Sequence, residues 1–185
     1  MDKQIIKLEE RKKFKFIREK VSHIEKEKVK LNVESFLKSF YKSTSINSYT
    51  AIYWPINNEI DIRSLKGKYP LALPRCKPNR CLEFHPWDDS PLERDVEGIP
   101  CPSNKKALGC HEISLILVPC LAVDRSLIRL GYGGGYYDKL RSNINWRSIK
   151  IIGVLTSNCV SDNLLVKEKW DIELNGFITE REIYE

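Results

Sequence analysis

The first forty residues place hydrophobic side chains at the spacing of amphipathic helices. Phe14, Ile17, Val21 and Ile24 recur three or four residues apart with mostly charged residues between them, which predicts a helix with one buried face. The stretch 22–25 reads Ser-His-Ile-Glu and is typical of a capping box, so we expect a second helix to begin there. The apolar stripe predicted for this second helix consists of Val29, Val33, Phe36, Leu37 and Phe40.

From residue 49 onward, short runs of β-branched and aromatic residues alternate with helical patterns. A helix is predicted over 57–65 and another over 136–141, while Pro74 is expected to end a strand and 77–80 to form a turn. Residues 86–108 are rich in Pro, Asp and Glu and are expected to form a long surface loop. The strands are predicted over 49–54, 69–73, 81–85, 113–118, 150–155 and 177–179.

This alternation predicts an α/β fold with an open, mostly parallel, Rossmann-like sheet, helices on both faces and an N-terminal helical segment. A chain of 185 residues is long enough for one well-buried core, so we expect residues 1–185 to form one domain. In open sheets of this kind, ligands bind beyond the carboxyl ends of the strands.

The composition excludes a membrane-spanning protein. Hydrophobic residues make up 42% of the chain, charged residues make up 30%, and no apolar run approaches the roughly 20 residues that span a bilayer. The first residues lack the apolar core and cleavage site of a secretory signal. We therefore expect a cytoplasmic protein without membrane contact.

Six cysteines and three histidines lack the spacing of a metal site. No two cysteines have the two-residue gap that zinc motifs favour, so we expect free thiols and no protein-bound transition metal. Cys120 follows a predicted strand and is expected to pack as a small hydrophobic residue. Cys76 and Cys81 flank a polar turn and are expected to be partly exposed.

The formal net charge of +6 arises near the start of the chain. Residues 1–42 hold 13 Lys and Arg against 7 Asp and Glu, whereas the rest holds 18 of each. This excess indicates either an anionic partner, such as a nucleotide, a polyglutamylated cofactor or nucleic acid, or a solvated helical face. Lys7 and Arg11 are four residues apart, so they lie on one side of the predicted helix and can reach one anion together.

The segment best suited to bind a ligand is 129–138, which reads Arg-Leu-Gly-Tyr-Gly-Gly-Gly-Tyr-Tyr-Asp. Its glycines permit backbone conformations whose N–H groups converge, and converging N–H groups bind anions. An apolar run precedes it and a predicted helix follows, an arrangement that binds phosphate at the helix N-terminus. The alternative is a flexible turn with its tyrosines in the core. The glycine spacing matches neither common nucleotide-binding pattern.

Two neighbouring segments carry a family resemblance. Leu-Val-Pro-Cys-Leu-Ala-Val-Asp at 117–124 and the glycine-rich segment at 129–138 resemble the signature of the 5-formyltetrahydrofolate cyclo-ligase family, also called 5,10-methenyltetrahydrofolate synthetases. Further matching positions follow the family's order over nearly the whole chain. They are Lys7, Arg11, 53–60 around Glu59, Leu-Pro-Arg at 73–75, Leu-Glu-Phe at 82–84, Gly-Ile-Pro at 98–100 and Phe-Ile-Thr-Glu at 177–180.

The resemblance implies ATP- and Mg²⁺-dependent cyclisation of 5-formyltetrahydrofolate to 5,10-methenyltetrahydrofolate, with release of ADP and phosphate. Lys7 and Arg11 are then expected to contact ATP phosphates, and Asp138 and Asn175 to hold Mg²⁺. The loop expected to wrap ATP consists of Arg129, Leu130, Gly131, Tyr132, Gly133, Gly134, Gly135, Tyr136 and Tyr137.

The same resemblance assigns roles in catalysis and folate binding. Arg129, Tyr136 and Tyr137 are the implied catalytic residues. Trp54 and Glu59 map onto substrate-contacting positions, although Trp54 can instead be a core residue and Glu59 a helix-start acid. The remaining implied contacts to folate are Tyr132, Gly133, Gly134, Gly135 and Tyr136.

The sequence departs from the family pattern at several positions. The most consequential is Asn175, which falls where the family carries an acid associated with the metal, so weaker retention of Mg²⁺ is expected. A folate-binding but inactive relative is therefore one alternative. The other departures are Cys101 in place of Glu, Cys120 in place of Gly, Val123 in place of an aromatic residue and Trp170 in place of His.

Two further functions stay open at this point. One is an ATP-dependent kinase or ligase that acts on another anionic small molecule. The other is a nucleic-acid-binding protein that uses the basic N-terminal helix and stacks bases on Tyr136 and Tyr137. The basic residues do not interleave with aromatic residues as in known RNA-binding patterns, so we expect no nucleic-acid partner. We expect a monomeric protein with a small-molecule substrate.

Overall fold

The computed structural model describes residues 2–43, 48–103 and 105–185. Two long helices come first, α1 (Lys3–Glu19) and α2 (His23–Ser43), and two short ones follow the glycine-rich segment, α3 (Tyr136–Ser142) and α4 (Ile144–Arg147). The predicted capping box is confirmed, because the Ser22 N–H donates to Glu25 Oε2 at 2.9 Å and the Glu25 N–H donates to Ser22 Oγ at 3.2 Å. Single 3₁₀ turns lie at Arg63–Leu65, Pro78–Arg80, Cys110–Glu112 and Ser157–Cys159.

A seven-stranded sheet forms the centre of the molecule, with the spatial order β12-β11-β9-β6-β1-β2-β3. The strands from β11 to β2 are parallel to their neighbours, and β12 and β3 run antiparallel at the two edges. The predicted open, mostly parallel sheet is therefore confirmed. The strands are β1 (Tyr49–Ala51), β2 (Leu71–Lys77), β3 (Cys81–Pro86), β6 (Ile113–Pro119), β9 (Lys150–Val154), β11 (Gly176–Ile178) and β12 (Ile183–Tyr184).

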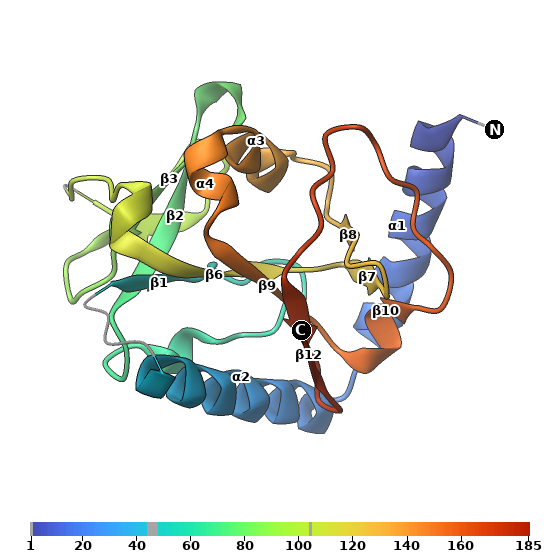
Figure 1. The fold of residues 1–185 in the computed structure, drawn as a ribbon, viewed down its shortest axis with the longest axis horizontal. Helices are drawn as coiled ribbons and strands as arrows, with labels where there is room; N and C mark the ends of the chain where they lie inside the picture. The colour runs from blue at the N-terminus through green and yellow to red at the C-terminus, as the bar shows by residue number, and fades with distance from the viewer. Residues whose placement is uncertain (1, 44–47, 104) are drawn as a thin grey trace.

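Helices cover both faces of this sheet, as predicted (Figure 1). α2 lies along one face, where Val33 and Leu37 pack with Leu115 and Leu117 of β6. α3 and α4 cover the other face, where Leu140 belongs to the same buried cluster as β6 and β9 residues. α1 stands at the end of the sheet beyond the carboxyl ends of the parallel strands, which is where ligands bind in folds of this type.

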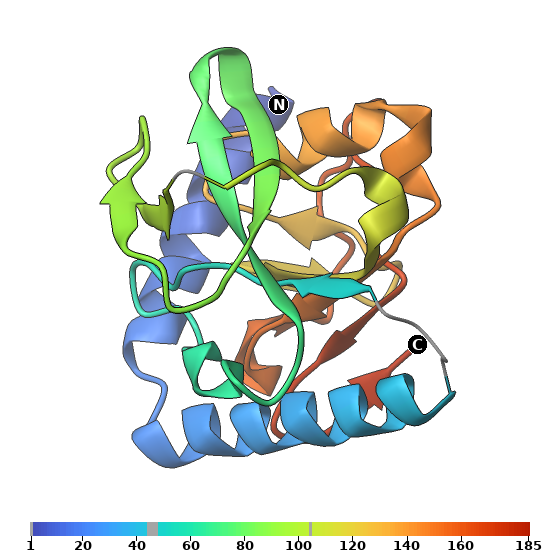
Figure 2. The same cartoon turned by 90° about the vertical axis from the view of Figure 1, so that its left-hand side faces the viewer.

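Two small sheets were not predicted. One joins β10 (Val160–Ser161), β7 (Ala122–Asp124) and β8 (Arg129–Leu130) beside α1. The other is a hairpin of β4 (Leu92–Arg94) and β5 (Pro100–Pro102) inside the predicted surface loop 86–108. Figure 2 shows the long β2–β3 hairpin next to it. These strands are two or three residues long, too short to produce a periodic pattern in the sequence.

Several predicted boundaries are wrong, for identifiable physical reasons. The helix predicted over 57–65 is a single 3₁₀ turn at its end, because Asn57 and Asn58 adopt left-handed φ angles of 47° and 63° that a helix excludes. Pro74 does not end β2. Ala72 O accepts from Ile52 N, so residue 72 faces β1, and residue 74 faces the same side because strand residues alternate. Pro74 lies beyond the last paired residue of β1, so the N–H that it lacks is not needed for pairing.

Exposure corrects two further predictions. Ile24 was expected on the buried stripe of the first helix, but it lies 68% exposed after that helix has ended. Cys76 was expected to be partly exposed, but it is buried on β2, whereas Cys81 is exposed as predicted. Within the described residues all six cysteines are free, and no helix is long and apolar enough to cross a membrane.

Candidate active site

The glycine-rich segment forms a loop between β8 and α3. It follows the short β7–β8 hairpin rather than the central strand β6, which corrects the predicted order of strand, loop and helix. Gly133 and Gly135 have φ angles of 103° and 72°, a region that residues with a side chain enter at a cost. Gly135 is the residue before α3, so the loop leads directly into the helix N-terminus. Glycine therefore stands at the two positions of this loop where the backbone requires it.

Helix α1 holds this loop from one side. The Arg11 Nε–H donates to Gly131 O at 3.0 Å, and Arg18 Nη1 donates to the Tyr132 hydroxyl oxygen at 2.6 Å. The other Arg18 amino group donates to Cys120 O, just after the carboxyl end of β6. Because Arg11 and Arg18 are seven residues apart, both lie on the inner face of α1. They bind neighbouring positions of the loop and tie it to the central sheet.

The opposite side of the loop is held by Arg129 and by the β4–β5 hairpin. Arg129 Nη1 donates to Pro119 O at 3.2 Å, and its guanidinium lies 5.1 Å from the centre of the Tyr137 ring. The Tyr136 hydroxyl donates to Glu97 Oε1 at 2.5 Å, and this bond raises the pKa of Tyr136. Arg129 therefore occupies a face of the Tyr137 ring, and Glu97 holds the Tyr136 hydroxyl.

Glu59 supplies a buried carboxyl group to the same region. Its side chain is 8% exposed, and its Oε2 accepts from the Ile56 N–H at 2.9 Å. Burial raises the pKa of Glu59 from 4.5 to about 7, although the Ile56 hydrogen bond and the charges of Arg18 and Arg129 act in the opposite direction. A carboxyl group with a pKa near neutrality, beside two arginines, is characteristic of a functional site.

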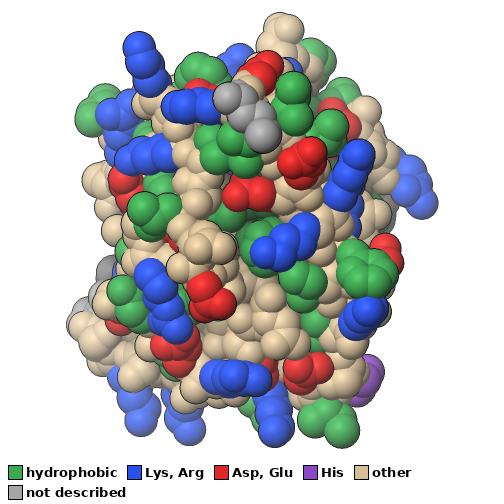
Figure 3. Space-filling model, turned by 90° about the vertical axis from the view of Figure 1, so that its right-hand side faces the viewer, with side chains coloured by type: hydrophobic (Ala, Val, Ile, Leu, Met, Phe, Trp, Pro, Cys, Tyr) green, Lys and Arg blue, Asp and Glu red, His purple; other side chains and the backbone are tan. Residues whose placement is uncertain are grey.

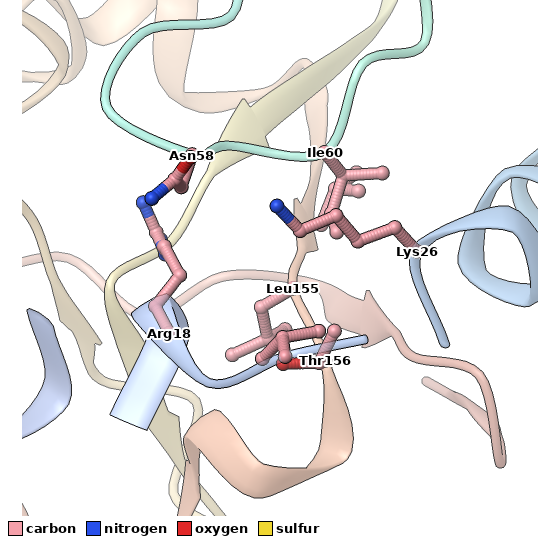
Figure 4. Close-up of a pocket in the computed structure, with 8 residues that line it drawn as sticks. Arg18, Lys26, Asn58, Ile60, Leu155 and Thr156 are labelled. Carbon is pink, nitrogen blue, oxygen red and sulfur yellow. The ribbon is translucent and has the colours of Figure 1, made fainter. Parts of the chain in front are cut away.

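Two adjoining cavities lie between α1 and the loop that carries Glu59. The larger encloses about 540 Å³, including the part that is open to solvent, and Tyr132 and Asn57 line it together with Lys15 and Glu19. The smaller encloses about 220 Å³ and continues toward Thr156, after the carboxyl end of β9. Arg18 and Asn58 line both. Figure 4 shows the Arg18 side chain extending toward Asn58, with Lys26 entering the smaller cavity from α2.

Three of the predicted site residues lie apart from this cluster. Lys7 Nζ forms an ion pair with Asp171 Oδ2 at 2.6 Å and does not contact the glycine loop in the part of the chain that is described. Trp54 packs against Trp87, with Arg63 stacked 4.4 Å from the centre of its ring, on the α2 side of the sheet. Asn175 is the third, and its position bears on the metal.

The predicted Mg²⁺ ligands differ in how well they fit that role. Asp138 lies in the first turn of α3 beside the glycine loop, with its carboxylate partly exposed and 3.8 Å from Arg129. A carboxylate oxygen at this place fits the hard ligand that Mg²⁺ prefers. Asn175 Oδ1 instead accepts from the Ile151 N–H at 2.8 Å, near the start of β9. No group of three His, Cys, Asp or Glu that could hold a metal ion occurs among residues 2–43, 48–103 and 105–185.

Sequence reasoning missed Arg18, which is the most deeply buried cation on α1 at 7% exposed. A signal was present, because Arg18 falls two helical turns after Arg11 and between the apolar positions Phe14 and Val21. Charged side chains are rarely buried, so a charged residue inside a predicted apolar stripe indicates a candidate functional residue. Glu97 and Asp171 were also missed, and nothing in their local sequence marks them.

The surface and the cysteines bear on the alternatives. Figure 3 shows the face on which α1 lies, where Lys and Arg side chains alternate with Asp and Glu instead of forming a continuous basic patch. This favours a solvated helical face for most of the lysines over a nucleic-acid footprint.

Burial raises the pKa of the Cys120 thiol to about 11, so this residue packs as a small hydrophobic group and not as a nucleophile.

Several curated proteins are similar to this chain in sequence. A curated 5-formyltetrahydrofolate cyclo-ligase from Haemophilus influenzae is 29% identical over 135 residues, which cover 67% of this chain and 71% of that protein. The Escherichia coli K12 protein of the same name is 30% identical over 105 residues, or 56% of this chain and 57% of that protein.

Solved structures agree. The Aquifex aeolicus 5,10-methenyltetrahydrofolate synthetase superposes with a TM-score of 0.78 at 28% identity, covering 97% of this chain and 92% of that one. The Mycoplasma pneumoniae synthetase, at 24% identity and covering 97% and 99% of the two chains, has a TM-score of 0.70 and supports the fold alone. With the family's sequence model matched over residues 4–180, the chain belongs to the 5-formyltetrahydrofolate cyclo-ligase family.

Proposed function

We propose that this protein catalyses the ATP- and Mg²⁺-dependent cyclisation of 5-formyltetrahydrofolate to 5,10-methenyltetrahydrofolate, with release of ADP and phosphate. Its family makes it a ligase of folate one-carbon metabolism. The observation that carries the proposal is the glycine loop beside α1, because Arg11 and Arg18 bind this loop next to a groove lined by Asn57 and Asn58, the residues directly before the buried Glu59. The loop proposed to bind phosphate and the carboxyl group proposed to bind the heterocycle thus lie in neighbouring segments beside one groove.

The residues suit phosphoryl transfer to an amide oxygen. In the proposed reaction the formyl oxygen attacks the γ-phosphorus of ATP and ADP leaves; N10 then attacks the formyl carbon, loses its proton, and the carbon–oxygen bond breaks as phosphate departs. Such chemistry needs positioning and charge neutralisation more than a protein nucleophile. Arg129 and the loop N–H groups are proposed to neutralise and orient the phosphoryl group.

Mg²⁺, held by Asp138 and by phosphate oxygens, would neutralise charge on the nucleotide. Asn175 as a second ligand remains a prediction, since its carbonyl oxygen already accepts a hydrogen bond from Ile151. Lys7 is expected to contact phosphate after leaving Asp171, and Arg11 to contact it from its place beside Gly131. The Glu59 carboxylate can accept the N–H groups of the pterin, and Trp54 is proposed as a second substrate contact.

We further propose that the protein works as a cytoplasmic monomer on a small-molecule folate. The family finding favours this function over the nucleic-acid-binding alternative. A kinase or ligase that acts on another small anion remains the competing enzyme, and it would use the same loop with a different occupant of the groove.

One assay tests the proposal and the competitor together. Purified protein is mixed with Mg²⁺, ATP and 5-formyltetrahydrofolate, and the absorbance of the methenyl product is followed alongside release of ADP. We expect product and ADP in equal amounts, and neither when ATP or the folate is omitted. ADP release stimulated equally by unrelated small acids, without the methenyl absorbance, would favour the competing enzyme.

A further inference from the structure

One hydrogen-bonded chain joins three segments of the groove. Arg18 Nη1 donates to the Tyr132 hydroxyl oxygen at 2.6 Å. Because an arginine has no acceptor, the Tyr132 oxygen accepts this bond and uses its own proton to donate to Asn57 O, at 3.1 Å. The chain therefore runs from α1 through the glycine loop to the loop that carries Glu59.

The Arg18 charge has no carboxylate partner in direct contact. Its guanidinium donates to a hydroxyl and to a carbonyl oxygen, and no ion pair within 4.0 Å involves it among the described residues. The carboxyl group that its charge influences is Glu59, whose own pKa is raised by burial. A buried cation without a paired anion costs stability, and structural arginines are usually paired. What sets Arg18 apart from other buried arginines is that its bonds reach the glycine loop and the end of β6 beside the groove.

The segment at the far end of the chain is strained. Asn57 and Asn58 have φ angles of 47° and 63°, and they stand directly before the buried Glu59. Backbone in this region can exchange between conformations when a stabilising contact is lost. The Tyr132 hydroxyl is the side-chain contact that holds Asn57 O, so the position of the glycine loop and the position of Glu59 depend on each other.

We propose that Arg18, acting through Tyr132, is a positioning residue that makes the binding of nucleotide and of folate interdependent. This inference rests on the proposed function, because it needs the glycine loop to bind ATP and the Glu59 loop to bind the folate. When ATP fixes the glycine loop, Tyr132 holds Asn57 and Glu59 in place. The binding free energy of the folate is then no longer reduced by the ordering of the segment that carries Glu59. Binding of the folate fixes the glycine loop for ATP in the same way, by the reciprocity of linked equilibria.

Calorimetric titration measures this coupling without turnover. The affinity of 5-formyltetrahydrofolate is determined with and without a saturating non-hydrolysable ATP analogue and Mg²⁺, and the reciprocal titration is also performed. We expect the analogue to tighten folate binding by at least about fivefold in the unaltered protein, and the folate to tighten analogue binding by the same factor. In Tyr132→Phe and in Arg18→Lys, both factors should fall to about one.

Arg141→Lys is the matched control. Arg141 is buried to the same extent, at 6% exposed, and donates to two backbone carbonyl oxygens, but it lies on α3 outside both cavities. It should keep the coupling factor of the unaltered protein. A variant that merely damages the fold weakens both ligands and leaves the ratio unchanged, so the ratio separates positioning from damage. If Arg18→Lys does not fold, Tyr132→Phe decides, since it removes a single hydroxyl.

The outcomes separate this inference from the proposed function. Coupling that is absent in the unaltered protein, or retained in Tyr132→Phe, overturns the role of Arg18 even if the methenyl product forms normally. Failure of the unaltered protein to bind the folate and to form that product instead overturns the proposed function itself.

Discussion

Replacing Glu59 by Gln is expected to stabilise the folded protein, and to do so more strongly as the pH rises. The side chain is 8% exposed and accepts one hydrogen bond, from the Ile56 N–H, which a glutamine oxygen can also accept. The substitution therefore keeps the shape and the hydrogen bond but removes the ability to ionise. Any gain in stability then measures the cost of the buried charge.

The magnitude follows from the pKa of Glu59, which burial raises from 4.5 to about 7. A carboxyl group with a higher pKa in the folded state binds its proton more tightly there, so it lowers stability as the pH rises above 4.5, and the loss is complete above about 7. Each tenfold change in an acid constant corresponds to about 1.4 kcal/mol. The cost is thus about 1 kcal/mol at pH 5.5 and about 3 kcal/mol at pH 8.

Urea unfolding of the unaltered protein and of Glu59→Gln at pH 5.5 and pH 8 gives the two free-energy differences. The advantage of the variant should grow by about 2 kcal/mol between these values. Glu9→Gln, on the exposed side of α1, is the control and should show no such growth. An advantage independent of pH would mean that Glu59 is not shifted by burial. The KM for 5-formyltetrahydrofolate should fall between pH 6 and 8 in the unaltered protein and stay flat in the variant.

Three more predictions concern the loop, the metal and the helix start. Asp138→Ala should abolish ATP-dependent formation of the methenyl product, and full retained turnover would remove Asp138 from the site. Gly135→Ala should cost about 1 kcal/mol and raise the KM for ATP, whereas Gly67→Ala, which also has a positive φ but lies far from the loop, should cost as much stability in thermal unfolding without changing that KM. Ser22→Ala should lower the free energy of unfolding by about 1 kcal/mol, since Glu25 loses its N-cap partner, and unchanged stability would refute the capping box.

The central sheet was predictable and its surroundings were not. β6 and β9 are continuous apolar runs because both of their faces are covered by helices, and such runs are visible in the sequence. β10 is defined by its pairing with β7, which lies far away in the chain, and β8 is a two-residue strand, so no local pattern records either of them. Pro74 misled for the same reason, since its place inside β2 depends on where the neighbouring strand stops.

The candidate site likewise contains residues that a local sequence pattern predicts and residues that it does not. The glycine loop was predictable because left-handed backbone leaves glycine in the sequence, at Gly133 and Gly135. Arg18 was predictable only as a charged residue inside an apolar stripe, because its partners Tyr132 and Cys120 lie more than a hundred residues away in the chain. The asparagines at 57 and 58 also tolerate left-handed backbone, and reading them that way would have removed the false helix.

What distinguishes a ligand site from a flexible turn here is the concentration of costly features around one groove. A buried cation at Arg18 and a buried carboxyl at Glu59 each lower stability, and Asn57 adopts left-handed backbone. Arg18 and Asn57 line the cavities, and Glu59 lies two residues after Asn57 in the same segment. Sequences depart from what folding favours mainly where function requires it. If the glycine loop only connected β8 to α3, a leucine could stand in place of Arg18 on the inner face of α1. Its replacement by an ordinary apolar residue should therefore preserve the fold while uncoupling the two ligands.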